Sequence, residues 1–413
     1  MLNIQQRLGE MKKWSEIKQI SPAGSLRRKK ETIGDIDILC TVEKGKEKAV
    51  IDKFVHLPYV KTKLAAGDTK ATIISDEGIQ VDVRVLEPNC YGAALQYFTG
   101  SKEHNIALRE LANKRNLTIS EYGVFKIGKK DKPIAGRTEE EIYHLLGLQF
   151  IPPELRENLG EIGAARIGKI PNLVEEKDIL GDLHVHSNYS DGNASIEQIA
   201  EHAKTKGWKW IVIADHSQSL KVAGGVSVKD VYRKIEEIKK LNLKDKSLRI
   251  LSGMEVDIHN DGSLDYDDEL LSKLDVVIAA IHTGFKQSEK QLTERILKAM
   301  DNEYVHMIAH PTGRLIGKRE PYSIDMERIL LMAEKTHTAI EINAFPERLD
   351  LYDIYSKKAK EMGIMLGIGT DAHAVEQLDY INLGVAVARR GWLEKKDILN
   401  TFSVDELLRK IKK

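Results

Sequence analysis

The chain has 413 residues, 42% of them hydrophobic, and this length predicts about two to three domains. Its 63 Lys and Arg balance 63 Asp and Glu, which excludes a chain that is polycationic over its whole length. No apolar run approaches the roughly 20 residues of a membrane span, and residues 1–19 lack the apolar core of a signal peptide. Because the only cysteines are Cys40 and Cys90, a disulfide framework is excluded, and we expect a cytoplasmic protein with no membrane partner.

The first 150 residues predict a small mixed domain. Apolar residues at steps of two to four predict a helix over residues 1–18, which the Ser-Pro-Ala-Gly-Ser run at 21–25 ends. Strands are expected over 36–42, 70–75 and 79–86, with a hairpin turn at 76–78, and helical spacing returns over 90–116. This part holds 25 Lys and Arg against 20 Asp and Glu. The excess fits a phosphate-rich partner, or equally a solvated surface.

From residue 180 onward, short apolar runs alternate with amphipathic segments, which predicts a parallel α/β architecture. The glycine-rich stretch 158–171 before it indicates a linker. In a closed barrel, the carboxyl ends of all strands open on the face where active sites lie. Strands are expected at 211–214, 250–256, 276–281, 305–309, 339–342 and 365–368. Helices are expected at 195–206, 228–240, 291–302, 324–335 and 351–363.

Nine metal-binding side chains stand at or just after these apolar runs. They are His184, His186, Asp191, His216, Glu255, His282, His310, Asp371 and His373. Imidazoles and carboxylates are the ligands of Zn²⁺, Mn²⁺ and Fe²⁺. Isolated buried histidines would explain one or two of these positions but not six at equivalent strand ends. Nine donors are too many for one ion, so the pattern predicts a metal cluster that hydrolyses phosphoester or carbonyl centres.

A second constellation lies near the N-terminus. Asp35 and Asp37 alternate on a strand, so both carboxylates face one way, and Asp82 stands on another strand. Three convergent carboxylates are costly unless a cation neutralises them, and oxygen-only ligands favour Mg²⁺ or Mn²⁺. The turn at Gly24 and Ser25 can offer backbone N–H groups to a triphosphate. The pattern is typical of nucleotidyltransferases, although Asp-x-Asp alone is usually an exposed strand face.

The nine rear residues resemble the metal positions of the polymerase and histidinol phosphatase (PHP) family over about residues 180–413. The resemblance implies a distorted (β/α)7 barrel with three divalent metals, Mn²⁺ or Zn²⁺ and possibly Fe²⁺, that hydrolyses phosphoesters. Four polar residues near predicted strand ends are candidates to hold substrate phosphate, or else ordinary surface residues. They are Arg314, Arg319, Asn343 and Arg348.

The front residues resemble family X DNA polymerases over about residues 20–150. The resemblance implies that Ser25 and Arg28 hold the triphosphate, beside Gly24, and that Arg84 neighbours the third aspartate. It further implies a nucleotide pocket in which Tyr97 and Phe98 lie against the incoming sugar, Asn105 contacts the base and Arg109 faces the template. Gly100 follows the aromatic pair. A simple helix-packing role for the aromatic pair is the alternative.

A nucleotidyltransferase palm before a PHP barrel is the domain order of bacterial and archaeal family X polymerases. We expect a palm over 1–88, a thumb over 89–150, a linker over 151–179 and the PHP barrel over 180–413. Family members normally begin with a lyase-type DNA-end-binding domain and fingers, whereas this palm motif starts at Gly24. A weak, salt-sensitive hold on DNA follows from that difference, because phosphate contacts supply much of nucleic-acid affinity.

The expected function is therefore DNA repair, of the base-excision type: gap filling with dNTPs at the three aspartates and metal-dependent 3′–5′ exonuclease action in the barrel. AP endonuclease and 3′-phosphatase action are further expectations from the resemblance. Gapped or 3′-recessed DNA is the expected partner, and the protein is expected to be a monomer. A small-molecule phosphatase of the histidinol-phosphatase type with an inactive palm is the main alternative, and a non-catalytic DNA-binding scaffold is a third hypothesis.

Overall fold

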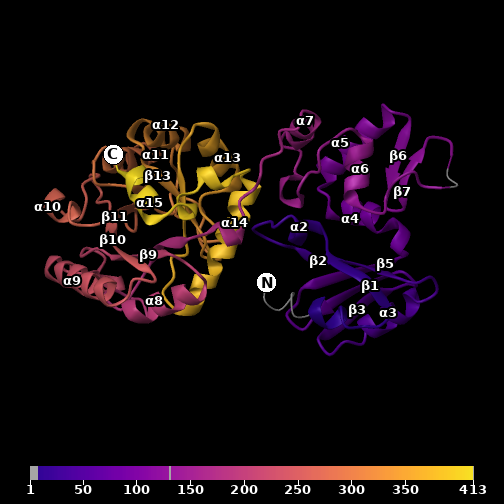
Figure 1. Cartoon of the computed structure of the whole chain (residues 1–413), viewed down its shortest axis with the longest axis horizontal. Helices are drawn as coiled ribbons and strands as arrows, with labels where there is room; N and C mark the ends of the chain where they lie inside the picture. The colour runs from indigo at the N-terminus through magenta and orange to yellow at the C-terminus, as the bar shows by residue number, and fades with distance from the viewer. Residues whose placement is uncertain (1–7, 130–131, 413) are drawn as a thin grey trace. The chain divides into compact units, whose positions relative to one another are not determined.

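The structure is a computed structural model that describes residues 8–129 and 132–412. The chain forms two compact units, unit 1 over Met1–Ile170 and unit 2 over Pro171–Lys413. Unit 1 runs from indigo to magenta and unit 2 from magenta to yellow in Figure 1. Within the described ranges, no helix is long and apolar enough to cross a membrane.

Unit 1 is built around a five-stranded mixed sheet of order β1-β2-β5-β4-β3. Its strands are β1 (Ile17–Pro22), β2 (Asp35–Val42), β3 (Val60–Ala66), β4 (Lys70–Ser75) and β5 (Gln80–Leu86). Only β2 and β5 pair in parallel. Alternate residues of β2, Ile36, Ile38 and Cys40, join the core that α3 (Glu47–Phe54) covers. The residues between them therefore face the other side of the sheet.

That other side carries the helical part of unit 1. Leu39 of β2 packs against Ala94 and Leu95 of α4 (Tyr91–Thr99). The helix expected over 90–116 is two helices, because Gly100 adopts a φ of 67° and Ser101 caps α5 (Lys102–Asn113) by accepting from the His104 N–H. The remaining elements are α2 (Gly24–Arg27), β6 (Leu117–Ser120), β7 (Gly123–Lys126), α6 (Glu139–Leu145) and α7 (Glu161–Arg166).

Two sequence-based expectations for unit 1 are corrected. Residues 1–7 of the expected 1–18 helix lie outside the described residues, helix is found only at 8–11, and β1 already begins at Ile17. Strand β3 was not predicted, because it lies at the sheet edge with six of its seven residues exposed and so lacks an apolar alternation.

Residues 151–170 pack onto unit 1 although they fall in the range expected as a linker. Ile151, Arg156 and Glu161 are fully buried there. The units divide at Ile170 and Pro171, inside the expected range of 151–179. The boundaries at 88, 150 and 179 remain predictions.

Unit 2 is a parallel seven-stranded barrel in sequential order, from β8 to β14. Its strands are β8 (Gly181–Val185), β9 (Trp210–His216), β10 (Arg249–Asp257), β11 (Val276–Ala280), β12 (Met307–Ile308), β13 (Ala339–Asn343) and β14 (Leu366–Gly369). A parallel bridge between Val185 and Ala372 brings the last strand back to the first, so the barrel is nearly closed. The expected α/β architecture with a (β/α)7 barrel is confirmed.

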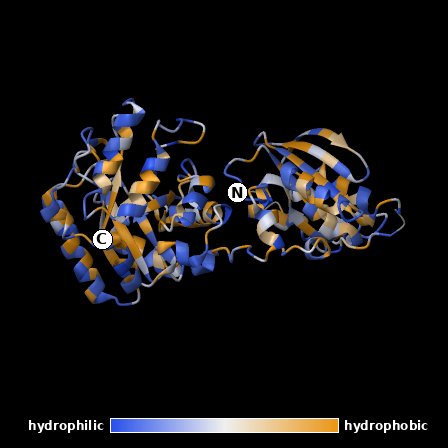
Figure 2. Ribbon diagram, turned by 90° about the horizontal axis from the view of Figure 1, so that it is seen from above, coloured by the Kyte–Doolittle hydropathy of each residue, from blue (hydrophilic) through white to orange (hydrophobic). Residues whose placement is uncertain are grey.

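Alternate residues of the strands face two cores, which explains why the apolar runs are continuous. Val212 and Ala214 of β9 point into the barrel, whereas Ile211 and Ile213 pack outward. The outer layer comprises α8 (Ile196–Thr205), α9 (Val228–Lys244), α10 (Asp268–Leu271), α11 (Glu289–Met300), α12 (Met326–Thr336), α13 (Asp353–Glu361) and α14 (Ile381–Arg390). Helix α15 (Val404–Ile411) instead packs Leu407 and Ile411 against the inner cluster that contains Val212 and Ala214. Figure 2 shows the barrel strands mostly in the orange of hydrophobic residues.

Candidate metal centres

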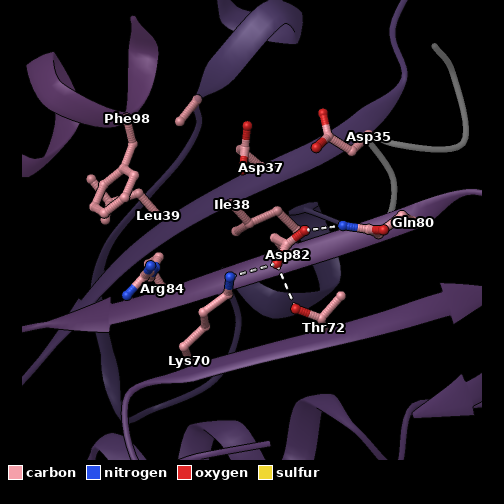
Figure 3. Close-up of a pocket in the computed structure, with 11 residues that line it drawn as sticks. Asp35, Asp37, Ile38, Leu39, Lys70, Thr72, Gln80, Asp82, Arg84 and Phe98 are labelled. Carbon is pink, nitrogen blue, oxygen red and sulfur yellow. Dashed lines mark hydrogen bonds and ion pairs between the residues drawn. The ribbon is translucent and has the colours of Figure 1, made fainter. Parts of the chain in front are cut away.

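The front site lies on β2 and β5. Their parallel register places Asp37 directly opposite Asp82, with Asp35 two residues earlier on the same face. One carboxylate oxygen from each of the three lies within 4.8 Å of the others. The three side chains line one cavity of about 350 Å³. Figure 3 shows them on two neighbouring strands, with Asp35 and Asp37 on one and Asp82 on the other. The three predicted carboxylates are thus brought together.

Asp82 is held by a set of neighbours that the sequence motif did not reveal. Thr72 Oγ1 donates to Asp82 Oδ1 at 2.6 Å, Gln80 Nε2 donates to Oδ2 at 2.7 Å, and Lys70 Nζ lies 3.3 Å from Oδ1. Burial raises the pKa of Asp82, but these donors together bring it below its usual value. Asp82 therefore keeps its negative charge in a fixed orientation.

Asp37 has the opposite electrostatic environment. Burial first, and then the charges of Asp35 and Asp82, raise its pKa to about 6. Three carboxylates that repel each other in this way fit a divalent cation, and their all-oxygen donor set suits Mg²⁺ or Mn²⁺.

Gly24 lets the backbone approach the aspartates. Its φ is +57°, and a Cβ on it would stand 2.1 Å from Asp37 Oδ2, so a larger residue would displace that carboxylate. Ser25 is the next residue of the four-residue helix α2. The predicted turn is therefore placed directly against one of the three carboxylates.

The other predicted nucleotide-binding residues divide into two groups. Arg84 and Phe98 line the cavity, with the guanidinium 5.1 Å from the ring centre, and Tyr97 packs edge-on against Phe98. The second group engages protein atoms. Arg28 pairs with Glu157 at 2.9 Å and donates to the Thr99 carbonyl.

Two further members of that second group lie on α5. Asn105 Nδ2 donates to the Tyr97 carbonyl at 2.7 Å, and exposed Arg109 donates to the Asn105 carbonyl at 3.3 Å. Gly100 directly follows α4, and a Cβ added to it would stand 3.2 Å from the Arg28 guanidinium. The structure therefore gathers these residues around α4 and α5, beside the cavity rather than in its lining.

The rear site lies at the carboxyl ends of the barrel strands. His184 and His216 stand within or at the end of β8 and β9, Glu255 lies near the end of β10, and the others follow strands or lie in loops. Their donor atoms form three overlapping groups, each within 4.8 Å. The groups are His186, Asp191, His216 and His373; His184, His186 and Glu255; and His216, Glu255 and His282.

Glu255 belongs to two of the three groups and lies among several imidazoles. Its Oε2 lies 2.8 Å from His216 Nδ1 and 3.5 Å from His184 Nε2. Neither Oε2 nor His216 Nδ1 has a hydrogen-bond partner within the described part of the chain, although both are buried. The Nε2 atoms of His184 and His186 are 3.1 Å apart. Two donors at about 2.1 Å from one ion stand about 3.0–3.4 Å apart, so the donor set fits bound metal.

His310 and Asp371 complete the predicted set. His310 Nε2 lies 2.8 Å from Glu255 Oε1, and Asp371 Oδ1 lies 3.1 Å from His186 Nε2. All nine predicted residues therefore converge at one end of the barrel.

The sequence motif did not reveal a supporting layer of acids. Glu341 Oε1 lies 2.7 Å from His184 Nδ1, and its other oxygen accepts from the His310 N–H at 2.7 Å. Asp257 Oδ1 lies 2.5 Å from His282 Nδ1. Such partners fix the tautomer and direction of a ligand imidazole. The only sequence signal is that Asp257 directly follows an apolar run and Glu341 lies within one.

The pKa values of His184 and His186 are shifted in opposite directions. Burial first, and then neighbouring imidazoles, lower the pKa of His186 to about 3, which leaves its ring neutral and able to donate a lone pair. Burial opposes protonation of His184 as well, but Glu341, Glu255 and Asp371 raise its pKa well above its usual value. Metal binding requires the neutral form, so cations must compete with a proton there.

The four candidate phosphate-binding residues differ from one another in whether they line the rear cavity and in what they contact. Arg319 and Arg348 line the rear cavity, and Arg348 Nε lies 3.1 Å from Asp371 Oδ2. Asn343 Nδ2 donates to the same carboxylate at 3.1 Å. Arg314 is buried and donates to the Arg348 and Leu349 carbonyls, so it is neither a cavity residue nor a solvated surface residue.

A three-aspartate sheet and a parallel barrel with nine converging metal donors define a class of enzyme: a nucleotidyltransferase joined to a metal-dependent hydrolase. Family models match in the same order, the DNA polymerase beta thumb at residues 94–157 and the PHP domain at 182–345. The DNA polymerase/3′-5′ exonuclease PolX of Bacillus subtilis (strain 168) is 42% identical over 399 residues, which cover 96% of this chain and 69% of that protein.

The barrel region alone also resembles phosphatases. A probable phosphatase of Thermoanaerobacter sp. (strain X514) is 31% identical over 232 residues, 53% of this chain and 89% of that protein. Another, from Caldanaerobacter subterraneus subsp. tengcongensis, is 31% identical over 238 residues, 55% of this chain and 88% of its own. Because the first relative extends over both units, the chain belongs to the family X DNA polymerases that carry a PHP domain.

Proposed function

We propose that the chain adds nucleotides to DNA 3′ ends at the front site and hydrolyses phosphoesters at such ends in the rear site. The observation that carries the proposal is the presence of two complete donor sets, each on its own unit, in the order of the PolX relative. DNA and dNTPs are the proposed substrates, and gap filling during repair with trimming of 3′ ends is the proposed task.

At the front site, we assign the three aspartates to Mg²⁺ or Mn²⁺, which would neutralise phosphoryl charge and activate a hydroxyl. The side chains of the unit supply orientation. Thr72 and Gln80 fix Asp82, Gly24 brings backbone against Asp37, and Arg84 supplies a cation in the cavity. Phe98 presents an aromatic surface to the nucleotide in the same cavity.

At the rear site, we assign the nine donors to three divalent ions, Mn²⁺, Zn²⁺ or Fe²⁺, which would lower the pKa of water and polarise a phosphoester. Arg319 and Arg348 line the cavity and are placed to neutralise phosphate oxygens. The same phosphoester hydrolysis at an abasic site within a strand, or at a 3′-phosphate, corresponds to AP endonuclease and 3′-phosphatase action respectively.

The test uses a labelled primer on a gapped template with Mn²⁺. Asp35→Ala/Asp37→Ala is expected to stop nucleotide addition and to leave primer degradation intact. His184→Ala/His186→Ala is expected to do the reverse, because the two donor sets lie on separate units. Retention of both activities by both double variants would contradict the assignment.

The likeness of the barrel to probable phosphatases favours a second candidate, hydrolysis of small phosphomonoesters. The two functions differ in what competes for the rear site. If the rear site hydrolyses DNA 3′ ends, a single-stranded oligonucleotide inhibits turnover of a small chromogenic phosphoester. If the rear site hydrolyses small phosphomonoesters, the oligonucleotide does not inhibit it.

A further inference from the structure

The rear cavity has an apolar rim that metal binding does not explain. Leu220, Val222, Phe285 and Leu315 line it beside the imidazoles and carboxylates. Val222 is 93% exposed, more than any other large hydrophobic residue in the described ranges. A single exposed valine is ordinary on a protein surface, but here it lies at the mouth of a metal-donor cavity with three further apolar side chains.

The loop that carries Val222 is firmly held at its base. It leaves β9 directly after His216, and the Val226 N–H returns to the His216 carbonyl at 2.9 Å. The Tyr266 hydroxyl donates to the Val226 carbonyl, and Ser219 Oγ donates to Asp257 Oδ2 at 2.8 Å. Asp257 in turn contacts His282, so the loop is anchored to the metal-donor layer itself. Residues 220–222, called the rim tip below, are therefore presented by a fixed frame.

The apolar side chains alternate with cations. Lys221 lies between Leu220 and Val222 in the rim tip. On the cavity lining, the Arg319 guanidinium lies 4.5 Å from the centre of the Phe285 ring. Apolar or aromatic surfaces combined with cations are what single-stranded nucleic acid requires, since each nucleotide offers an apolar base face and a phosphate. A small phosphomonoester without an apolar ring has no second group that could use the rim tip.

We propose that the rim tip, together with Phe285 and Arg319, is a subsite for an unpaired nucleotide at a DNA 3′ end. Val222 and Leu220 contact the base, and Lys221 and Arg319 face its phosphate. The subsite rests on the proposed phosphoesterase function of the barrel and gives that site its preference for single-stranded ends over small phosphoesters.

The test compares two substrates in the 413-residue chain with Mn²⁺. One is a 5′-labelled single-stranded oligothymidylate, and the other is bis(p-nitrophenyl) phosphate, which carries no base. Val222→Asn is expected to lower kcat/KM for the oligonucleotide relative to the small ester by about 5- to 10-fold, because the apolar contact of one valine side chain with a base face is lost. The inhibition constant of a 3′-phosphorothioate oligothymidylate against hydrolysis of the small ester should rise by a similar factor.

Leu331→Asn is the matched control, because Leu331 is 58% exposed on α12 and does not line the cavity. It should leave the ratio and the inhibition constant at their wild-type values. An unchanged oligonucleotide kcat/KM in Val222→Asn, or an equal loss on both substrates, would overturn the subsite. Inhibition that depends on Val222 without any cleavage of the oligonucleotide would retain the subsite and overturn the proposed exonuclease function.

Discussion

The three front carboxylates differ in how the protein holds them. Asp82 is buried and accepts hydrogen bonds on both oxygens, whereas the environment of Asp37 raises its pKa to about 6. One carboxylate is thus fixed by neighbours and another is left for a cation to stabilise. The fixed one depends on ordinary polar residues of β4 and β5 rather than on motif residues.

Thr72→Val tests that dependence, because it preserves shape and removes the hydroxyl that donates to Asp82 at 2.6 Å. A hydrogen bond to a charged group contributes about 1.5–3 kcal/mol, so nucleotide addition should fall by about 10- to 100-fold while primer degradation continues. Single-nucleotide primer extension measures the first and loss of labelled primer the second. Thr62→Val, on exposed β3, is the control, and full extension by Thr72→Val would refute the role of the hydroxyl.

Glu341 has the corresponding role in the rear site. It contacts the ring of His184 and the backbone of His310. Because such partners typically contribute 10- to 100-fold to metal affinity, Glu341→Gln should weaken Mn²⁺ binding by about that factor. Bound metal after dialysis against graded Mn²⁺ gives the affinity directly. Glu334→Gln, on the exposed side of α12, should retain wild-type affinity, and equal metal content in both variants would exclude this role.

At the scale of elements, the sequence predicts strands that carry a buried apolar pattern and misses a strand that carries none. Strand β4 has the predicted bounds because its apolar residues are buried, whereas β3 is exposed and carries no such pattern. The nine rear donors could be predicted because each accompanies an apolar strand. Thr72, Gln80 and Glu341 could not, since a polar residue on a strand gains its role only from which strands become neighbours.

A buried chain of hydrogen-bonding groups ties three helices of unit 1 together. His104 of α5 lies 2.6 Å from Glu161 of α7 and 3.0 Å from the hydroxyl of Tyr143 of α6. Burial lowers the pKa of His104 despite Glu161, and the pKa of Glu161 is also lowered, against its burial, by His104. The neutral ring can donate to the carboxylate and accept from the hydroxyl at the same time.

The stability of unit 1 should consequently fall as the pH drops below about 6.5, where the unfolded histidine takes up a proton that the folded one resists. One such group changes the free energy of unfolding by at most about 1.4 kcal/mol per pH unit. Urea unfolding at pH 7.5 and 5.5 measures the slope. His104→Gln should be less stable at pH 7.5 and lose less on acidification. His56→Gln, at an exposed position, should keep the wild-type slope, and an unaltered slope in His104→Gln would reject the assignment.

At the scale of the whole molecule, the two units have separate hydrophobic cores and separate metal-donor sets. A ligand that binds only the folded form stabilises the unit that holds it, by about 2.7 kcal/mol at 100 times its Kd. The rear set contains buried imidazoles and carboxylates that are costly to keep together without cations. Metal should therefore act mainly on the unfolding of unit 2.

Calorimetry with and without a chelator tests this division. Removal of Mn²⁺ should lower the Tm of one of two transitions by several degrees, because unit 2 loses the bound ions. The shift should disappear in His184→Ala/His186→Ala and persist in Asp35→Ala/Asp37→Ala, since the second pair lies on unit 1. A Mn²⁺-dependent shift that survives in the histidine variant and vanishes in the aspartate variant would place the stabilising ions on the front unit instead.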